Sequence, residues 1–307
     1  MKLQRLALVL AGVGLLASTA TTTASATSTA SAARGSAAAA TENCGSSVVW
    51  PTKANVVDTV DIGAHKPPRL VYPPYVYSKF FATRFMDRWY LAWNAAGTQY
   101  YAFGLFLLGS NLYRQTTVLS GRSPAQSTAV RVGTGWASFT SIATSNYPLK
   151  GSRPAYLYGL NSNGNLYRYA PNGTGYKSAG SFAGFKGFKT MTMISEEMTY
   201  DTLLMTTKAG ALYTIHIPTT TKAKPVVRLI RKSGWAAYES LVVNKCGVNG
   251  ATIITAVDHD TDTGYQYGFS KFNGTATATM SYGKIPATFN GTNHAALTGF
   301  QFLLLAE

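Results

Sequence analysis

The densest group of chemically active side chains in the sequence is the acidic run "DHDTDTG", residues 258–264. Aspartates at alternate positions ahead of a glycine offer the hard oxygen ligands that Ca²⁺ prefers. Asp is also a common turn former, and the run lacks the distal Glu of a helix–loop–helix calcium site. We therefore favour a solvated turn and keep a calcium site at Asp258, Asp260 and Asp262 as the alternative. No other cofactor is expected.

Groups that could catalyse a reaction are sparse elsewhere. Glycoside hydrolysis needs two carboxyl groups that flank the scissile bond. Glu239 is the best placed of the 12 acidic residues, but similar segments of the chain carry Thr140 and Lys189 at the corresponding position. The chain contains no Gly-x-Ser-x-Gly motif, and its four histidines show no paired metal-ligand spacing. The sequence therefore predicts a protein that is not an enzyme.

The elements that would position any site come from a repeat of about 50 residues. Three segments share a pattern of glycine, aromatic, two spacers, aromatic, spacer, small hydroxyl and aliphatic: "GWASFTSI" from residue 135, "GFKGFKTM" from residue 184 and "GWAAYESL" from residue 234. A fixed period of this size is typical of solenoids and propellers. We expect the repeated aromatics to serve first as core and interface residues; they are Trp136, Phe139, Phe185, Phe188, Trp235 and Tyr238.

A hairpin with a turn rich in Gly, Asn or Asp follows each of these segments, at residues 157–169, 203–215 and, more loosely, 255–267. Residues 103–115 fit the same scheme, and no segment of 12 or more residues has a convincing helical period. Four short strands repeated radially form the blade of a β-propeller.

The predicted fold is thus all-β, a propeller that most simply has five four-stranded blades, with six as the alternative. Three units are clear, and they cover residues 134–182, 183–232 and 233–284. Residues 75–133 hold a fourth unit. The C-terminus supplies about two strands of a fifth, which N-terminal strands within residues 46–52 and 55–62 complete. If residues 90–103 formed a hairpin of their own, a sixth blade would result.

The N-terminus has the features of a secretory signal peptide. Lys2 and Arg5 precede an apolar run of 12 residues, which is shorter than the ~20 residues that a spanning helix needs. We assign residues 1–26 to the signal peptide, residues 27–42 to a disordered Ala/Ser/Thr-rich segment, and residues 43–307 to a single domain. The protein is expected to be secreted and extracellular, with no membrane contact, and to be a monomer.

The charge balance favours anionic partners outside the cell. Three of the 27 basic residues and none of the 12 acidic residues lie within the first 34, so the rest of the chain carries a net charge of +12. Solubility alone is a sufficient explanation, and attraction to anionic wall or extracellular polysaccharide is the alternative. The basic residues are scattered apart from residues 222–232, so no nucleic acid is expected.

Two cysteines, Cys44 and Cys246, remain in the exported part of the chain. An even number in an oxidising compartment predicts a disulfide. Cys44 begins the folded region, and Cys246 lies in a turn of the unit that starts at Gly234. The bond would therefore lock the closing blade to its neighbour.

These motifs resemble the tachylectin family of secreted β-propeller lectins. The shared pattern is Gly–Trp/Phe–x–x–Phe/Tyr, followed roughly 30 residues later by Gly–x–Leu–Tyr. It is found with Gly164, Leu166 and Tyr167 in one unit and with Gly210, Leu212 and Tyr213 in the next, whereas the third unit has Gly264 followed by Tyr265-Gln266-Tyr267. The resemblance implies five blades and binding of N-acetylated amino sugars between blades.

We therefore predict a carbohydrate-binding protein that recognises amino sugars or cell-wall polysaccharide without turnover. Flat aromatic rings stack on the C–H faces of sugars, and a repeated scaffold adds avidity. The candidate sugar-binding residues are Trp136, Tyr167, Phe185, Tyr213 and Trp235. The alternatives are a secreted enzyme that acts on glycans and a structural or adhesive surface protein with no small ligand.

Overall fold

The computed structural model describes residues 44–52, 56–72, 74–79, 83–87, 90–93, 96, 98–120, 123–145, 153–220, 224–247, 249–291, 296–297 and 305–307. The predicted signal peptide and the Ala/Ser/Thr-rich segment lie outside these residues. Every regular element within the described ranges is a β-strand. None of these ranges contains a helix that could cross a membrane.

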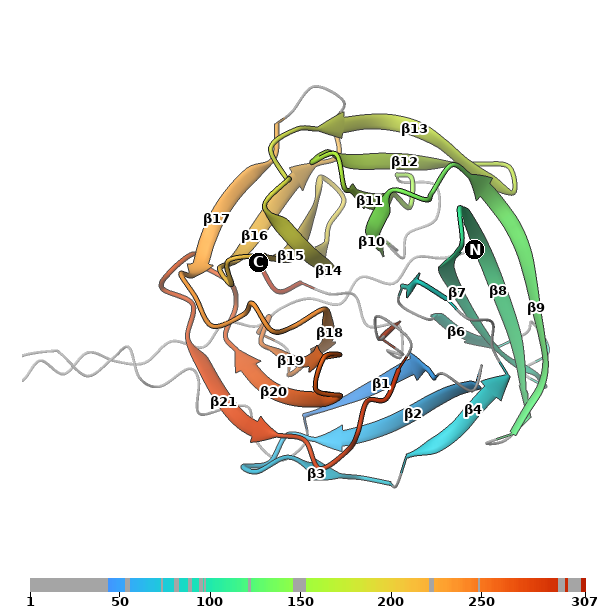
Figure 1. Ribbon diagram of the computed structural model, residues 1–307, viewed down its shortest axis with the longest axis horizontal. Helices are drawn as coiled ribbons and strands as arrows, with labels where there is room; N and C mark the ends of the chain where they lie inside the picture. The colour runs from blue at the N-terminus through green and yellow to red at the C-terminus, as the bar shows by residue number, and fades with distance from the viewer. Residues whose placement is uncertain are drawn as a thin grey trace, which may run out of the picture. The chain divides into compact units, whose positions relative to one another are not determined.

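Five antiparallel sheets form five blades arranged in a ring (Figure 1). Blades 3, 4 and 5 are regular four-stranded meanders that match the three units recognised in the sequence. Blade 3 contains β10 (Phe139–Thr144), β11 (Leu157–Asn161), β12 (Leu166–Asn172) and β13 (Gly175–Phe182). Blade 4 contains β14 (Phe188–Glu196), β15 (Tyr200–Thr207), β16 (Leu212–Pro218) and β17 (Val226–Arg231). Blade 5 contains β18 (Ser240–Lys245), β19 (Thr252–Asp258), β20 (Thr263–Phe269) and β21 (Thr279–Lys284).

Blade 2 contains residues 90–103, the segment that the sequence analysis considered as a possible sixth blade. Its strands are β5 (Phe85–Met86), β6 (Tyr90–Trp93), β7 (Tyr100–Leu108), β8 (Asn111–Ser120) and β9 (Ser123–Thr134). Both β5 and β6 pair with β7, at opposite ends of that strand. The β6–β7 hairpin is therefore part of blade 2, and the propeller has five blades.

Blade 1 joins the two ends of the chain, as predicted. Its strands run in the order β22 (Ala296–Leu297), β1 (Gly45–Pro51), β2 (Val56–Gly63) and β3 (Arg69–Leu70), and β4 (Tyr75–Lys79) also pairs with β2. One detail differs from the prediction, because residues 75–79 belong to blade 1 instead of the following unit. Within the described residues the C-terminus contributes β22 to blade 1, and Leu305 forms an isolated bridge with Ser195 of blade 4. Residues 298–304, where a second C-terminal strand would fall, lie outside the described residues.

Apolar clusters hold the ring together, and each pair of neighbouring blades shares at least one. Trp136 and Phe139 pack against blade 2, Phe185 and Phe188 against blade 3, and Trp235 and Tyr238 against blade 4. Two further clusters join blade 5 to blade 1, and one joins blade 1 to blade 2. The predicted core role of the repeated aromatics is thus confirmed.

Cys44 and Cys246 form a disulfide between the residue before β1 and the turn that follows β18. The bond therefore connects blade 1 to blade 5. It lies at the ring closure, as the sequence predicts.

Candidate functional site

A tyrosine recurs at one position of the third strand in four successive blades. In each blade the tyrosine is the second or third residue of that strand, and its side chain is half-buried. Cross-strand pairing fixes the equivalence, because each tyrosine lies opposite the same position of the second strand. The four residues are Tyr113, Tyr167, Tyr213 and Tyr265. Blade 1 has Asp58 at this position, opposite Trp50.

In blades 3, 4 and 5 the tyrosine lies against the aromatic at the start of its own blade, whereas in blade 2 Tyr113 stacks on Phe106 of the adjacent strand β7, with ring centroids 5.4 Å apart. The ring centroids of Phe139 and Tyr167 are 5.6 Å apart, and those of Phe188 and Tyr213 are also 5.6 Å apart. The third pair, Tyr238 and Tyr265, is separated by 6.1 Å. These aromatic contacts hold each tyrosine in place while part of it stays in solvent, which is the arrangement that a sugar-stacking platform needs.

The positions of the five predicted sugar-binding residues fall into two groups. Trp136, Phe185 and Trp235 are only 4%, 4% and 5% exposed, and they fill the interfaces between blades. Tyr167 and Tyr213 are half-buried and reach solvent. The two tyrosines can therefore contact a ligand directly, whereas the three buried rings can support the tyrosines from below. Sugar binding by these residues stays a prediction.

Blade 3 has the most polar surroundings of the series. The side-chain amides of Asn163 and Asn165 donate to the Tyr167 hydroxyl over 3.2 and 3.5 Å. These hydrogen bonds, with that of Asn165 the larger cause, lower the pKa of Tyr167. Asn163 is exposed and Asn165 half-buried, so the site combines an aromatic face with amide donors and acceptors.

The turn ahead of Tyr167 is held in place by the same kind of side chain. Oδ1 of Asn161 accepts the backbone N–H of Asn163 over 3.0 Å, and Oδ1 of Asn163 accepts that of Asn165 over 2.9 Å. Gly164 closes the turn with a φ of 91°. The Asn-rich turn thus presents its amides in a fixed geometry before any ligand arrives.

Blade 5 follows the same plan in a register that the sequence did not reveal. In the turn between β19 and β20 the residue with positive φ is Asp262, at 53°, and Gly264 occupies the position of Leu166 and Leu212. Asp tolerates the left-handed conformation better than most residues do, which allows it to replace glycine. The turn glycine of the predicted pattern is therefore not Gly264, and Tyr265 is the equivalent of Tyr167.

Phe289 is a fourth repeated aromatic that the sequence analysis missed. Its N–H donates to the carbonyl of Asp262 over 2.9 Å, as the N–H of Phe185 does to Gly164 and that of Trp235 does to Gly210. The Phe289 side chain is fully buried between blades 5 and 1. No glycine precedes it in the sequence, so the motif gave no signal.

The acidic run in blade 5 forms a turn. Oδ1 of Asp258 accepts the backbone N–H groups of Asp260 and Thr261 over 2.9 and 3.2 Å. Across the described part of the chain, no three His, Cys, Asp or Glu residues are grouped so that they could hold a metal ion. Calcium binding at Asp258, Asp260 and Asp262 stays a prediction without support from this geometry.

Glu239, the best-placed acid of the sequence analysis, is engaged by its neighbours. It forms an ion pair with Lys189 of blade 4, and its Oε2 accepts the backbone N–H of His259 over 2.8 Å. Ser240 Oγ lies 2.9 Å from Nε2 of His259, and burial lowers the pKa of that imidazole. Ser240 is only 2% exposed, so this Ser–His contact is shielded from any substrate.

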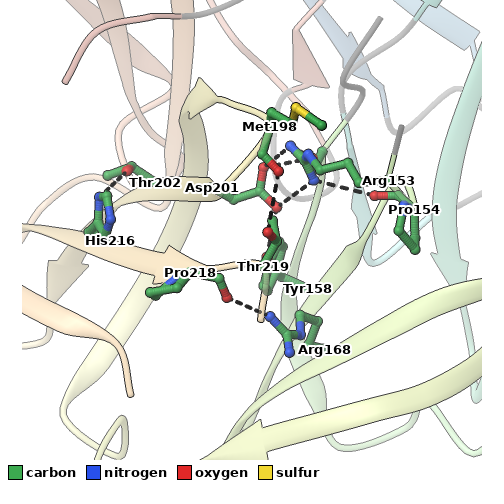
Figure 2. A network of polar contacts seen from close by, with 11 residues as sticks. Arg153, Pro154, Tyr158, Arg168, Met198, Asp201, Thr202, His216, Pro218 and Thr219 are labelled. Carbon is green, nitrogen blue, oxygen red and sulfur yellow. Dashed lines mark hydrogen bonds and ion pairs between the residues drawn. The ribbon is translucent and has the colours of Figure 1, made fainter. Parts of the chain in front are cut away.

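A second polar network lies at the other end of the blades, between blades 3 and 4 (Figure 2). Oδ1 of Asp201 accepts from Arg153 Nη2 over 2.6 Å and from Ser145 Oγ over 2.7 Å, and its Oδ2 accepts from the Tyr158 hydroxyl over 2.8 Å. Burial raises the pKa of Asp201, although Arg153 opposes that shift. Both carboxylate oxygens are occupied and the Asp201 side chain is inaccessible, so the network joins blades and has no oxygen left for a substrate.

Arg168 makes a similar connection nearby. Its Nη1 donates to the carbonyl of Pro218 over 2.9 Å, and its guanidinium lies 4.8 Å from the centroid of the Tyr156 ring. The residue is 1% exposed. Sequence reasoning did not find the contacts of Arg153 with Asp201 and of Arg168 with Pro218, because each joins blades 3 and 4 through residues that share no motif.

No protein-family model matches the chain, and no curated protein matches it. Among solved structures, one similar to it is an Aleuria aurantia lectin described as a six-bladed β-propeller with a novel fucose recognition mode. The TM-score is 0.45 at 12% identity, over 79% of this chain and 78% of the lectin. The catalytic domain of a Coprinopsis cinerea GH62 α-L-arabinofuranosidase gives 0.43 at 12% identity, over 72% and 75% of the two chains. Similarity at this level assigns neither a family nor a ligand.

Proposed function

We propose that the protein binds carbohydrate, without turnover, at the tyrosine positions of successive blades. The observation that carries the proposal is the recurrence of a half-buried tyrosine at one position in four blades. Core packing explains the buried aromatics beside it, but it does not require a ring that stays partly in solvent at each repeat. Cell-wall polysaccharide or another polymer of amino sugars would meet several such rings at once.

The site at Tyr167 offers the best set of groups for a sugar. A pyranose that stacks on the exposed part of the ring would bring its hydroxyl or acetamido groups within reach of Asn163 and Asn165. Amide side chains both donate and accept, as sugar hydroxyls do. The single site should bind weakly, and the repeated sites should make binding to a polymer tighter.

The absence of turnover rests on how the acids are used. Glu239 is paired with Lys189, and Asp201 is buried with both oxygens accepting hydrogen bonds. Hydrolysis of a glycan bound at Tyr167 would require two carboxyl groups on either side of the glycosidic bond. Neither Glu239 nor Asp201 lies beside Tyr167 to serve as one of them.

We also infer that the protein acts outside the cell. The disulfide between Cys44 and Cys246 supports this inference, because such bonds persist in oxidising compartments. The basic N-terminal residues and the apolar run after them give it further support from the sequence.

Calorimetric titration with soluble oligomers of N-acetylglucosamine, followed by mass spectrometry of the oligomers, tests the proposal. Tyr167→Ala should weaken binding by about tenfold, in line with the loss of one stacking contact. Tyr72→Ala, which removes an exposed tyrosine in the bend between β3 and β4 and away from the four repeated tyrosines, is the matched control and should bind as the wild type does. Shortened oligomers would show an enzyme, and binding that is unaffected by Tyr167→Ala would contradict the site.

A further inference from the structure

Every blade places a positively charged residue on its outermost strand. The strands concerned are β3 and β4 in blade 1 and β9, β13, β17 and β21 in blades 2 to 5, and they lie around the circumference of the ring (Figure 1). One exposed Lys or Arg can be named in each blade: Arg69, Arg131, Lys177, Arg228 and Lys284. We call these five residues the cationic rim.

Acidic residues are absent from the same strands. The six outermost strands, as the structure bounds them, contain seven Lys and Arg residues and no Asp or Glu. The acids of the described chain lie instead on inner strands, in turns or in the interior, as Asp61, Asp260 and Asp201 do. Positive charge is therefore concentrated on the circumference and is not neutralised there.

The rim cations are available to a partner. The side chains of Arg69, Arg131, Lys177 and Lys284 make no ion pair or hydrogen bond with any residue that the structure describes. Arg228 has one loose contact, 3.7 Å from Glu307, and its side chain is 53% exposed. Unpaired cations of this kind create a positive potential that attracts polyanions.

The 50-residue repeat explains why these residues look scattered in the sequence. Arg131, Lys177, Arg228 and Lys284 follow one another at intervals of 46 to 56 residues, close to the length of a blade. Each blade thus contributes a cation at a similar place. The pattern is a property of the ring, and a search for dense basic clusters along the chain misses it.

We propose that the cationic rim binds an acidic polysaccharide whose chain lies along the circumference of the propeller. Cations that are separated by the width of a blade suit a long, flexible polymer, because many weak contacts add up along one chain. A nucleic acid duplex carries a charge about every 1.7 Å and would meet only a few of them. The proposal does not depend on the tyrosine sites, because it uses a different surface.

Affinity electrophoresis of the full chain in gels that contain a polymer tests the rim. Polygalacturonate supplies carboxylates, poly(glycerol phosphate) supplies phosphodiesters, and dextran is the neutral reference. We expect retardation by polygalacturonate, and retardation by poly(glycerol phosphate) alone would overturn the assignment to a polysaccharide. Retardation should fall as salt is added, because screening weakens contacts between exposed charges. Equal mobility in the anionic polymers and in dextran would overturn the proposal.

The decisive comparison is between two triple variants with the same net charge. The rim variant combines Arg131→Gln, Lys177→Gln and Lys284→Gln. The control combines Lys186→Gln, Lys208→Gln and Lys245→Gln, which are exposed lysines outside the outermost strands. The rim variant should bind the anionic polymer on the order of 100-fold more weakly, since one cation near an anionic surface contributes roughly a factor of five. The control should change by less than about threefold.

Two outcomes would overturn the assignment. An equal loss in both triple variants would show that net charge alone attracts the polymer. Tighter binding of single-stranded DNA than of polygalacturonate would make the rim a nucleic acid surface. The rim variant should still bind soluble oligomers of N-acetylglucosamine as the wild type does, so failure of the tyrosine sites and failure of the rim are distinguishable.

Discussion

Cys44 and Cys246 are bonded to each other across 202 residues of chain, with their Cα atoms 5.2 Å apart. The bond joins blades 1 and 5, which are the first and last sheets that the chain builds. Strand pairing also closes blade 1, because β22 pairs with β1 over two residue pairs. Such a short pairing resists opening weakly, so the disulfide is the stronger link at this point of the ring.

Loss of the disulfide should therefore lower stability markedly. Closing a loop of this length contributes about 5 kcal/mol in the chain-entropy description. Cys44→Ser with Cys246→Ser should lower the free energy of unfolding in urea by up to that amount and leave the far-UV circular dichroism unchanged at 25 °C. An unchanged unfolding midpoint, or free thiols in the wild-type protein purified without reductant, would contradict the role of the bond.

Gly264 should not tolerate a larger side chain. A Cβ at this position would lie 2.4 Å from the Phe289 ring, and that ring is fully buried against Trp50 at a centroid distance of 5.0 Å. Because the ring cannot move aside, Gly264→Ala should cost about 1–3 kcal/mol. Gly187→Ala, where a Cβ would meet no atom within 4 Å, is the control and should stay within about 0.5 kcal/mol.

A double-mutant cycle makes this test specific. Phe289→Ala alone should cost about 3–5 kcal/mol through the cavity it leaves. In that background Gly264→Ala should cost much less than it does in the wild type, because the colliding ring is gone. Additive costs would show that the two residues do not interact.

How far the sequence predicts this molecule depends on whether a feature repeats. The glycine–aromatic period locates blades 3 to 5, and the leftover strands at the two ends predict the closure and its disulfide. Asp262 and Phe289 do not match the sequence pattern: Asp262 stands where the other turns have glycine, and no glycine precedes Phe289. Their roles become visible only through the backbone contact between them.

In the candidate site, too, the sequence predicts the repeated residues but not the contacts between blades. The sequence places Tyr167 and Tyr213 in a repeat, but it cannot tell these half-buried residues from the buried Trp136, Phe185 and Trp235. Burial depends on which side of each ring the neighbouring blade covers. A contact between blades such as that of Arg153 with Asp201 has no local signature at all, since 48 residues separate the partners.

The ion pair of Arg153 and Asp201 should be costly to break. Arg153→Met would leave a buried carboxylate without its cation, which typically costs about 3–5 kcal/mol. Arg228→Met removes an arginine that is half-exposed and loosely paired, and should stay within about 0.5 kcal/mol. Chemical denaturation of both variants at neutral pH measures the difference, and equal costs would contradict the burial argument.

The same carboxyl group should make stability depend on pH in a defined direction. Burial raises the pKa of Asp201 above its usual 3.8, so the folded protein keeps this proton at pH values where the unfolded chain has released it. The contribution of this carboxyl group to the free energy of unfolding is largest below pH 3.8 and declines as pH rises through the raised pKa of the folded state. The stability of the wild type relative to Asp201→Asn should therefore fall across that interval. A rise over the same range would mean that Arg153 outweighs burial.

Residues 305–307 should stabilise the junction of blades 4 and 5. The N–H of Ala306 donates to Ile194 of β14 over 3.1 Å, and its carbonyl accepts the N–H of Phe272, just after β20, over 2.6 Å. Glu307 adds a backbone N–H bond of 2.9 Å to Ser195 Oγ and a contact of 2.7 Å to Nδ1 of His216. Removal of the three residues deletes these bonds together with the fully buried Ala306.

At about 1 kcal/mol for each backbone hydrogen bond, the truncation should lower the free energy of unfolding by about 3 kcal/mol. Hydrogen exchange would show where the loss falls. The amide of Phe272 should exchange faster in the truncated chain, because its acceptor is gone. The amide of Phe185, which donates to Gly164 between blades 3 and 4 over 2.8 Å, should exchange as in the full chain. Faster exchange at both amides would mean that the three residues stabilise the whole ring, and no change at Phe272 would mean that they do not stabilise this junction.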